Sequence, residues 1–318
     1  MTVVLDGGLA TELEARGHDL SDRLWSARLL LTDPAAIEDV HRAYFAAGAQ
    51  VATTASYQAT IEGFAAAGHD RATALRAMRT SVEVARRARD DAAEAAGVDP
   101  ATLLVAGSCG PYGAMLADGS EYRGDYDPGE TALRDLHGPR METLLEAGAD
   151  LLAIETIPTV REAEIVVRLV DELGATAWLS VQCRDDRSTA AGEPTSAVAA
   201  LARDVAGLVA IGVNCTAPRH VPTLLRTLGA ATDLPRIAYP NGGDRWDGQA
   251  RRWVADGEAG AFDATVVASW ASVGAGWLGG CCGTGPADIA ALAAAIGLAQ
   301  VSSGRGTASG AGAGAGIR

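Results

Sequence analysis

Three cysteines lie where apolar runs of the sequence end, and thiols at such positions could bind a soft metal ion. Cys281 and Cys282 are adjacent and interrupt a glycine-rich stretch that follows Leu278. Neighbouring cysteines rarely form a disulfide with each other, because the Cα separation and the dihedral angle fit poorly across one peptide unit. Cys215 follows a second apolar run, 208–211, and precedes a turn that contains proline. Three thiolates would hold Zn²⁺ with its fourth position open, which is the pattern of a catalytic rather than a structural zinc site.

A cysteine taken alone has a simpler interpretation, since it is most often a small buried hydrophobe. We interpret Cys109 and Cys183, the remaining two of the five cysteines, in this way. The metal hypothesis depends on the other three thiols acting together, each at the carboxyl end of a predicted strand. Reduced thiols of this kind also favour a reducing compartment over a disulfide framework.

Two acidic residues also end apolar runs, and they could bind a cationic group. Asp6 ends the first such run and is followed by Gly7-Gly8. A glycine turn that leads into a helix exposes main-chain N–H groups, which could bind a carboxylate while Asp6 binds an ammonium. Glu155 ends the run 151–154, where a carboxylate is costly to bury unless it meets a cation. The alternatives are that Asp6 caps the following helix and that Glu155 forms a structural salt bridge with an arginine.

The composition excludes several functions. The chain has 318 residues and a formal net charge of −14, which argues against nucleic acid or an anionic membrane as a partner. All 26 basic residues are arginine, and the absence of lysine argues against Schiff-base aldolases, pyridoxal phosphate enzymes and P-loop enzymes, since each uses a lysine amine. No apolar run is long enough for a membrane span, and the first residues lack the basic and apolar regions of a signal peptide. We therefore expect a cytoplasmic protein.

Strands and helices alternate along the sequence, which predicts an α/β protein with a single-domain (β/α)8 fold, the TIM barrel. Apolar runs predict eight strands, at 3–6, 50–54, 103–107, 151–155, 177–182, 208–211, 236–239 and 276–278. Helical patterns predict helices at 9–16, 33–47, 70–96, 130–147, 160–173 and 286–298. In such barrels the active site lies at the carboxyl ends of the strands, where the three cysteines and two carboxylates all fall.

Three segments have separate roles in this prediction. The barrel would cover 1–301. Residues 302–318 are rich in glycine, alanine and serine with little to bury, so we expect a disordered tail. The polar loop 117–127 is long enough to form a lid over the strand ends.

Five stretches, which span the chain apart from its tail, together resemble the homocysteine S-methyltransferase family. They are Leu5-Asp6-Gly7-Gly8, Leu24-Trp25-Ser26-Ala27-Arg28, Ile154-Glu155-Thr156-Ile157-Pro158, Gly212-Val213-Asn214-Cys215-Thr216 and Gly279-Gly280-Cys281-Cys282-Gly283. The Asn-Cys motif and the cysteine pair are specific, whereas the other three are weak singly and persuasive in order. The resemblance implies a zinc-dependent barrel that methylates the thiol of L-homocysteine to give methionine.

The resemblance also implies roles for the candidate residues. The homocysteine sulfur would take the fourth zinc position beside the three cysteines. Asp6 and Glu155 would bind the homocysteine ammonium, and the amides around Gly7 to Leu9 its carboxylate. Asn214, next to a metal ligand, would act through hydrogen bonds that orient the site rather than by direct contact.

Within the family, the sequence most resembles the branch that uses S-methylmethionine or S-adenosylmethionine as the methyl donor. The stretches 24–28, 116–126 and 239–241 resemble that branch. The betaine-using branch has a tyrosine where this chain has Thr156, and it has a long C-terminal oligomerisation arm where this chain has a glycine-rich tail. Both departures argue against betaine as the methyl donor, and the missing arm favours a monomer.

A sulfonium cation has no hydrogen-bond donors, so the faces of aromatic rings would bind it. Trp25 is the first candidate for this role and Tyr57 the second, although either could be an ordinary buried aromatic residue. Two further alternatives remain open. The first is the same chemistry with another thiol or selenol as acceptor, or with betaine as donor. The second is a catalytically silent barrel that binds zinc or thiols.

Overall fold

The computed structural model describes residues 2–297 except 204, 244, 248–251 and 255–261, so the predicted tail lies outside the described residues. Parallel strands form one sheet in the spatial order β1-β10-β7-β6-β5-β4-β3-β2. Their bounds are β1 Val3–Val4, β2 Val51–Thr53, β3 Leu104–Cys109, β4 Leu151–Ile157, β5 Ala177–Val181, β6 Leu208–Asn214, β7 Arg236–Tyr239 and β10 Ala275–Leu278. A parallel bridge between Leu5 and Val51 joins the two ends of this order, so the sheet is a nearly closed barrel. The predicted (β/α)8 fold is confirmed.

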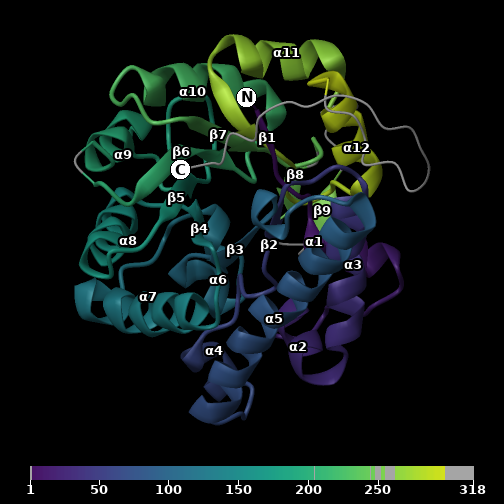
Figure 1. Cartoon of the computed structure of the whole chain (residues 1–318). Coiled ribbons are helices and arrows are strands. Elements are labelled where there is room, and N and C mark those ends of the chain that lie inside the picture. Colours follow the sequence, from purple (N-terminus) through teal and green to yellow (C-terminus); the bar gives the residue numbers. More distant parts are fainter. Residues whose placement is uncertain (1, 204, 244, 248–251, 255–261, 298–318) are drawn as a thin grey trace.

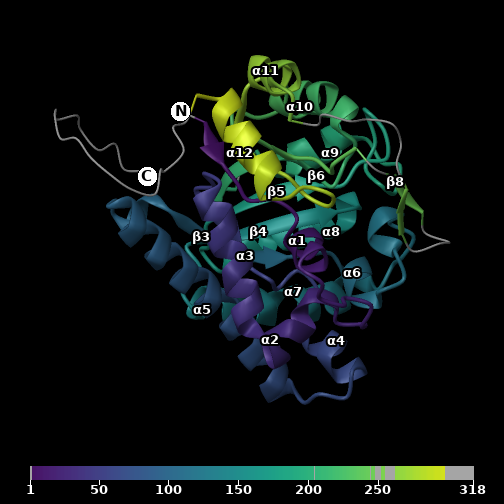
Figure 2. The same cartoon turned by 90° about the vertical axis from the view of Figure 1, so that its right-hand side faces the viewer.

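Helices surround the barrel on its outer side (Figures 1 and 2). They are α1 Leu9–Ala15, α2 Leu29–Thr32, α3 Pro34–Ala46, α4 Ile61–Ala66, α5 Arg71–Ala96, α6 Tyr112–Leu116, α7 Gly129–Glu146, α8 Val160–Glu172, α9 Thr195–Leu201, α10 Val221–Gly229, α11 Ala264–Ser272 and α12 Pro286–Ala295. None of these described helices combines the length and the apolar composition that a membrane span requires.

Local sequence signals explain where the long helices begin and end. The Asp33 side chain accepts a hydrogen bond from the Ala36 N–H, and proline follows it at the first helical position of α3. The Asp70 side chain caps α5 in the same way, through the Thr73 N–H at 2.7 Å. Gly97 then ends α5 in the left-handed conformation, at φ 67°. These caps place the predicted α3 and α5 close to their expected bounds.

Side chains fill the interior of the barrel. The ring of Trp178 lies 6.0 Å from the ring of Trp277 and 6.2 Å from that of Tyr239. A second apolar layer packs between the sheet and the helices, and it includes the fully buried Leu13, Met78 and Trp270. Because the interior is packed, the pocket of the molecule opens at the rim of the barrel, where the strands end.

Several predicted boundaries were wrong by a few residues. β3 continues to Cys109 because it stays paired with β4, although its last residues lack an apolar pattern. β4 likewise continues past Glu155 to Ile157, and α12 ends at Ala295, before Gly297 at φ 76°. A short antiparallel pair, β8 Arg245–Asp247 and β9 Arg252–Val254, was not predicted. None of these differences moves a candidate residue away from the rim.

Candidate functional site

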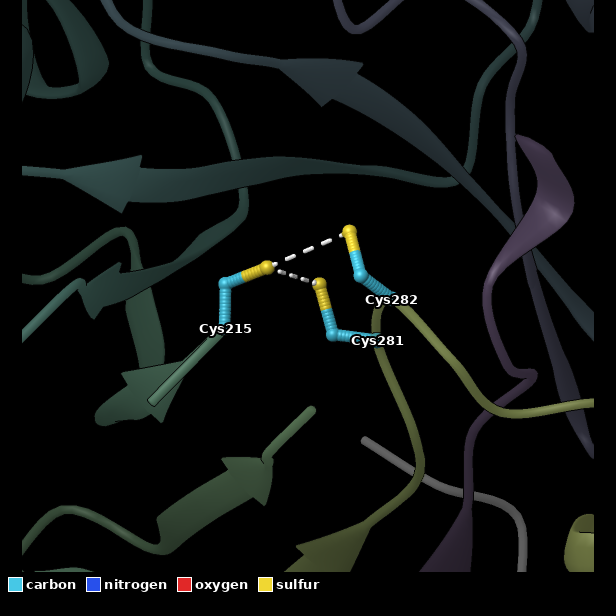
Figure 3. A group of neighbouring side chains, drawn as sticks. All are labelled: Cys215, Cys281 and Cys282. Carbon is cyan, nitrogen blue, oxygen red and sulfur yellow. Dashed lines mark hydrogen bonds between the residues drawn. The ribbon is translucent and has the colours of Figure 1, made fainter. Parts of the chain in front are cut away.

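The three predicted metal-binding cysteines lie together at the carboxyl ends of β6 and β10 (Figure 3). The Sγ atom of Cys215 lies 2.8 Å from that of Cys281 and 3.5 Å from that of Cys282. All three sulfur atoms lie within 4.8 Å of one another. One ion could therefore contact all three, and the cluster could hold a metal.

The strand between them in the sheet, β7, brings the cysteines together. The Cys215 N–H donates to the carbonyl of Tyr239 at 3.1 Å, and the Cys281 N–H donates to that of Pro240 at 2.8 Å. Two main-chain segments that are far apart in sequence are thus fixed on adjacent carbonyls. Cys215 adopts the left-handed conformation, at φ 47°, which a residue with a side chain rarely adopts and which is common at functional sites.

The donor set fits zinc. Zinc binds thiolate sulfur at about 2.3 Å in a tetrahedron, which places two sulfurs about 3.8 Å apart. The distance from Cys215 to Cys282, 3.5 Å, is close to that value, and the distance to Cys281, 2.8 Å, reaches it with a small side-chain rotation. A set made only of thiolates favours zinc or copper over the hard cations that prefer oxygen.

The three thiols share their protons unequally. Hydrogen bonds from Cys215 and Cys281 hold the pKa of Cys282 well below its ordinary value. The same bonds raise the pKa of Cys215, because its proton is shared with Cys281 and Cys282 in a buried site.

Asn214 connects this cluster to β4 and β5. Its Oδ1 atom accepts hydrogen bonds from the Thr156 N–H at 2.7 Å and from the Ser180 hydroxyl at 2.8 Å. Its Nδ2 atom donates to Thr156 Oγ1 at 2.7 Å and lies 3.9 Å from the Cys281 sulfur. Asn214 is fully buried, contacts a sulfur of the cysteine cluster and bonds to Thr156 and Ser180.

The carboxylate of Asp6 faces the same pocket and is fixed by β2. Its two oxygens accept hydrogen bonds from the Thr53 N–H at 2.7 Å and the Thr53 hydroxyl at 2.8 Å. α1 has Gly8 as its N-cap, without a side-chain hydrogen bond, so Asp6 does not cap that helix. Burial raises the pKa of Asp6 to about 8, despite the two bonds from Thr53, which lower it. A buried carboxylate with such a pKa becomes charged readily when a cation arrives.

Glu155 lines the same pocket as Asp6 and is also buried. Its Oε1 atom accepts a hydrogen bond from the Ser108 hydroxyl at the end of β3. Within the described part of the chain, no arginine forms a salt bridge with it, so the structural ion pair is not what holds Glu155 there. Burial raises the pKa of Glu155 to about 7, partly opposed by the bond from Ser108. The described residues that line the pocket thus include two carboxyl groups and no basic side chain.

Aromatic rings also line the pocket, and those of Trp25, Tyr57 and Tyr122 form its aromatic wall. The rings of Trp25 and Tyr57 meet edge to face, with centroids 6.1 Å apart, and both side chains are half-buried. Tyr122, from the loop that was predicted to form a lid, lines the same pocket and contacts Cys282. Trp25 and Thr156 both adopt positive φ, at 52° and 60°, so strained backbone surrounds the site.

A family model described as homocysteine S-methyltransferase matches residues 3–296. The chain belongs to this family. It is 48% identical over 293 residues to the homocysteine S-methyltransferase of Escherichia coli K12, covering 92% of this chain and 94% of that one. The metallated crystal form of the E. coli homocysteine methyltransferase MmuM superposes with a TM-score of 0.83 at 46% identity, covering 92% of this chain and 96% of that one. A selenocysteine Se-methyltransferase from Brassica oleracea var. italica is 42% identical over 303 residues, covering 91% of this chain and 87% of that one.

As a member of the homocysteine S-methyltransferase family, the chain is a methyltransferase, and its pocket gathers the residues that the sequence singled out. The predicted residues that line the pocket are Asp6, Gly7, Gly8, Trp25, Tyr57, Glu155, Cys215, Cys281 and Cys282. Sequence reasoning missed others that line it, namely Thr53, Ser108, Tyr122 and Tyr239. Three of these four follow or end apolar runs, as the predicted residues do, and Tyr122 lies within the stretch 116–126 that resembles the donor-specific branch.

The glycine pair of this homocysteine S-methyltransferase family member serves close packing. A Cβ atom on Gly8 would lie 2.5 Å from the carbonyl oxygen of Cys281, and one on Gly7 would lie 2.9 Å from the ring of Tyr44. The Gly8 N–H donates to the Thr284 carbonyl at 3.0 Å and to its hydroxyl at 3.1 Å. The turn between β1 and α1 is therefore fixed against the loop that carries Cys281 and Cys282.

Replacing Gly8 with alanine is expected to destabilise the protein by about 1–3 kcal/mol and to lower its metal content. The backbone of Gly8, at φ −70° and ψ 95°, is accessible to alanine, so the cost comes from the contact with Cys281. Urea unfolding and metal analysis would measure both effects. The matched control is Gly138→Ala in α7, where the nearest atom to a new Cβ, on Leu169, lies 3.9 Å away. That change is expected to be neutral or stabilising, and equal stability of the two variants would contradict the packing argument.

Proposed function

We propose that the protein transfers a methyl group from a sulfonium donor, S-methylmethionine or S-adenosylmethionine, to the thiol of L-homocysteine and forms methionine in a zinc-dependent reaction. The observation that carries this proposal is one pocket that is lined by three clustered thiols, two buried carboxyl groups and an aromatic wall. Each group matches one part of the two substrates: a sulfur atom, an ammonium and a sulfonium cation.

The three cysteines would hold the zinc ion. Zinc would bind the homocysteine sulfur and keep it deprotonated at neutral pH, where a free thiol with a pKa near 8.5 is mostly protonated. Asn214 would keep Cys281 in place through its amide group, and the carbonyls of β7 would keep Cys215 and Cys281 at a fixed separation. Three thiolates leave the site net anionic, which favours a sulfur that is rich enough in electrons to attack.

The carboxylates would bind the amino-acid end of homocysteine. Asp6 and Glu155 are both buried and line the pocket. An ammonium bound between them would favour their ionised forms, because its charge and its hydrogen bonds would offset the cost of burying the carboxylates. The carboxylate of homocysteine would contact the amides around Gly7 to Leu9. Because the Gly8 N–H already donates to Thr284, the amide of Leu9, which opens α1, is the better placed donor.

The aromatic wall would bind the donor. A sulfonium cation is attracted to the faces of aromatic rings, and Trp25 and Tyr57 offer such faces beside the sulfur cluster. The homocysteine sulfur then forms a bond to the methyl carbon as the bond from that carbon to the donor sulfur breaks, with the three atoms in line. No proton moves at the carbon, so the residues of the pocket act mainly by aligning the two substrates.

A selenol acceptor is the second candidate, because a relative with 42% identity is named a selenocysteine Se-methyltransferase. The metal-binding cluster and the carboxylates would serve a selenol amino acid equally well, since only the nucleophilic atom differs.

Betaine as donor is less favoured. Thr156 stands where betaine-using relatives have a tyrosine, and its side chain bonds to Asn214. We further propose that the protein is a monomer, which sedimentation would test.

Methionine formation from homocysteine with each donor in turn, with and without a zinc chelator, tests the proposal. We expect turnover with at least one sulfonium donor, little with betaine, and loss of activity on chelation that zinc restores. Activity that persists in metal-free protein would refute zinc dependence. Homocysteine binding without turnover of any donor would instead support the catalytically silent barrel.

A further inference from the structure

A buried carboxylate outside the pocket bonds to the chain at two points, one before the predicted lid loop 117–127 and one near the end of that loop. Glu162, on α8, has no exposed surface. Its Oε1 atom accepts a hydrogen bond from the N–H of Tyr112, where α6 begins, at 2.7 Å. Its Oε2 atom accepts a hydrogen bond from the hydroxyl of Tyr126, near the far end of the loop, at 2.6 Å. The segment between these two tyrosines is therefore bonded at both of its ends to the same carboxylate.

The same carboxylate is connected to the wall of the pocket through two more buried side chains of α7. Glu162 Oε1 lies 2.7 Å from His137 Nε2, and His137 Nδ1 lies 2.8 Å from the guanidinium of Arg140. Burial lowers the pKa of His137, so the neutral ring donates from Nε2 and accepts at Nδ1. Arg140 donates to the carbonyl of Gly110 at 2.5 Å and to that of Tyr57 at 3.3 Å.

These contacts fix the position of two aromatic rings in the pocket. The ring of Tyr57 packs on Gly110, where a Cβ atom would lie 2.6 Å from Tyr57 Cε2. Tyr122 lies between the two fastened ends of the loop, in the short helix Ser120–Tyr122. A Cβ atom on Gly113 would lie 2.5 Å from the Glu121 N atom and 2.7 Å from the Tyr126 ring, so the loop folds tightly back on α6.

We propose that Glu162 is a positioning residue, which holds the 117–127 loop closed over the pocket through Tyr126 and keeps Tyr57 in place through His137 and Arg140. This positioning should affect binding of the methyl donor more than binding of homocysteine. Tyr57 and Tyr122 belong to the aromatic wall, whereas Asp6 and Glu155 are fixed by Thr53 and Ser108 on other strands. The inference rests on the proposed function for its kinetic part, but the closure of the loop is measurable without turnover.

Tyr126→Phe tests the proposal because it removes only the hydroxyl that bonds to Glu162. The loop contains Arg123, whose side chain is 45% exposed, so trypsin cleavage after Arg123 reports opening of the loop in the zinc-loaded protein. Loss of one hydrogen bond to a charged group is expected to accelerate that cleavage about tenfold. The KM for the sulfonium donor should rise about five- to tenfold, while the KM for homocysteine changes less than about twofold.

The matched control is Tyr112→Phe, which keeps both the main-chain N–H that bonds to Glu162 and the ring that packs on Tyr126, with centroids 5.5 Å apart. It should behave as the wild type. Glu162→Gln, which presents an NH₂ group to the same donors, is expected to open the loop further. If that variant does not fold, Tyr126→Phe alone decides.

Unchanged cleavage and an unchanged KM for the donor in Tyr126→Phe would overturn the proposal. So would equal losses for both substrates together with a lower melting temperature, since these indicate a purely structural role. Failure of the proposed function is a separate outcome. It would show as an absence of methyl transfer in the wild type, with the difference in cleavage still present.

Discussion

Replacing Cys215 with alanine is expected to abolish zinc binding and to reduce methyl transfer at least about 10³-fold, the largest effect of any single substitution. The Cys215 sulfur lies 2.8 Å from that of Cys281 and 3.5 Å from that of Cys282, so it joins the β6 side of the cluster to the loop after β10. Without it, the remaining pair comes from a single loop and cannot close a site with one open position. The homocysteine thiol would then be mostly protonated at neutral pH, and it would lose its fixed place next to the donor.

Metal analysis of the purified variant, together with methionine formation at saturating substrate, would measure both losses. The wild type should carry about one zinc per chain. Cys183→Ala is the matched control, because Cys183 is a buried thiol near the end of β5 that takes no part in the cluster. It should keep its zinc and its activity. Normal turnover in Cys215→Ala, or zinc loss in the control, would contradict the assignment of the cluster.

The cluster was predictable from sequence because its position follows from a simple rule. In a parallel barrel the carboxyl ends of all strands lie on one rim, so residues that directly follow apolar runs meet there. Cys215, the pair Cys281 and Cys282, and the two carboxylates all satisfy that rule. The eightfold alternation predicted the barrel for a related reason, since strand and helix periods are local properties of the chain.

The contacts that orient these residues were not predictable, because they join segments far apart in sequence. Nothing near Asp6 indicates that Thr53 satisfies both of its oxygens, and nothing near Gly8 indicates that Thr284 accepts its N–H. Tyr122 lines the pocket from a loop whose later residue, Tyr126, bonds to Glu162 on a later helix. Long-range hydrogen bonds of this kind have no period and no local composition by which a sequence could signal them.

Strained backbone at the rim is a further consequence that only the structure shows. Trp25, Thr156 and Cys215 have positive φ, and each lines the pocket. Left-handed conformations cost non-glycine residues about 1–3 kcal/mol each, and they persist only where neighbours enforce them. The neighbours are visible here, since Asn214 bonds to both main-chain and side-chain atoms of Thr156. The same amide lies 3.9 Å from the Cys281 sulfur, so one residue contacts both the strained backbone and the cysteine cluster.

Glu155→Gln is expected to raise the KM for homocysteine about 10- to 100-fold while leaving zinc content and the KM for the donor nearly unchanged. The substitution removes the charge that would pair with the ammonium but keeps an oxygen for the Ser108 hydroxyl. Asp6→Asn is a less clean test. Both oxygens of Asp6 accept bonds from Thr53, so an NH₂ group would face a donor and disturb β2.

The pH dependence of kcat/KM for homocysteine shows whether Glu155 acts through the charge of its carboxylate or only through the packing of its side chain. Burial raises the pKa of Glu155 to about 7 and that of Asp6 to about 8, so both carboxyl groups become protonated and neutral as the pH falls through this range. Only the charged forms attract an ammonium, and kcat/KM of the wild type should therefore fall as the pH decreases from 8 to 6. In Glu155→Gln one of the two titrating groups is gone, so the fall should be shallower and start from a lower value. A variant that kept the full wild-type slope would show that Glu155 does not carry the charge that homocysteine meets, and the ammonium would then have to be bound by Asp6 alone.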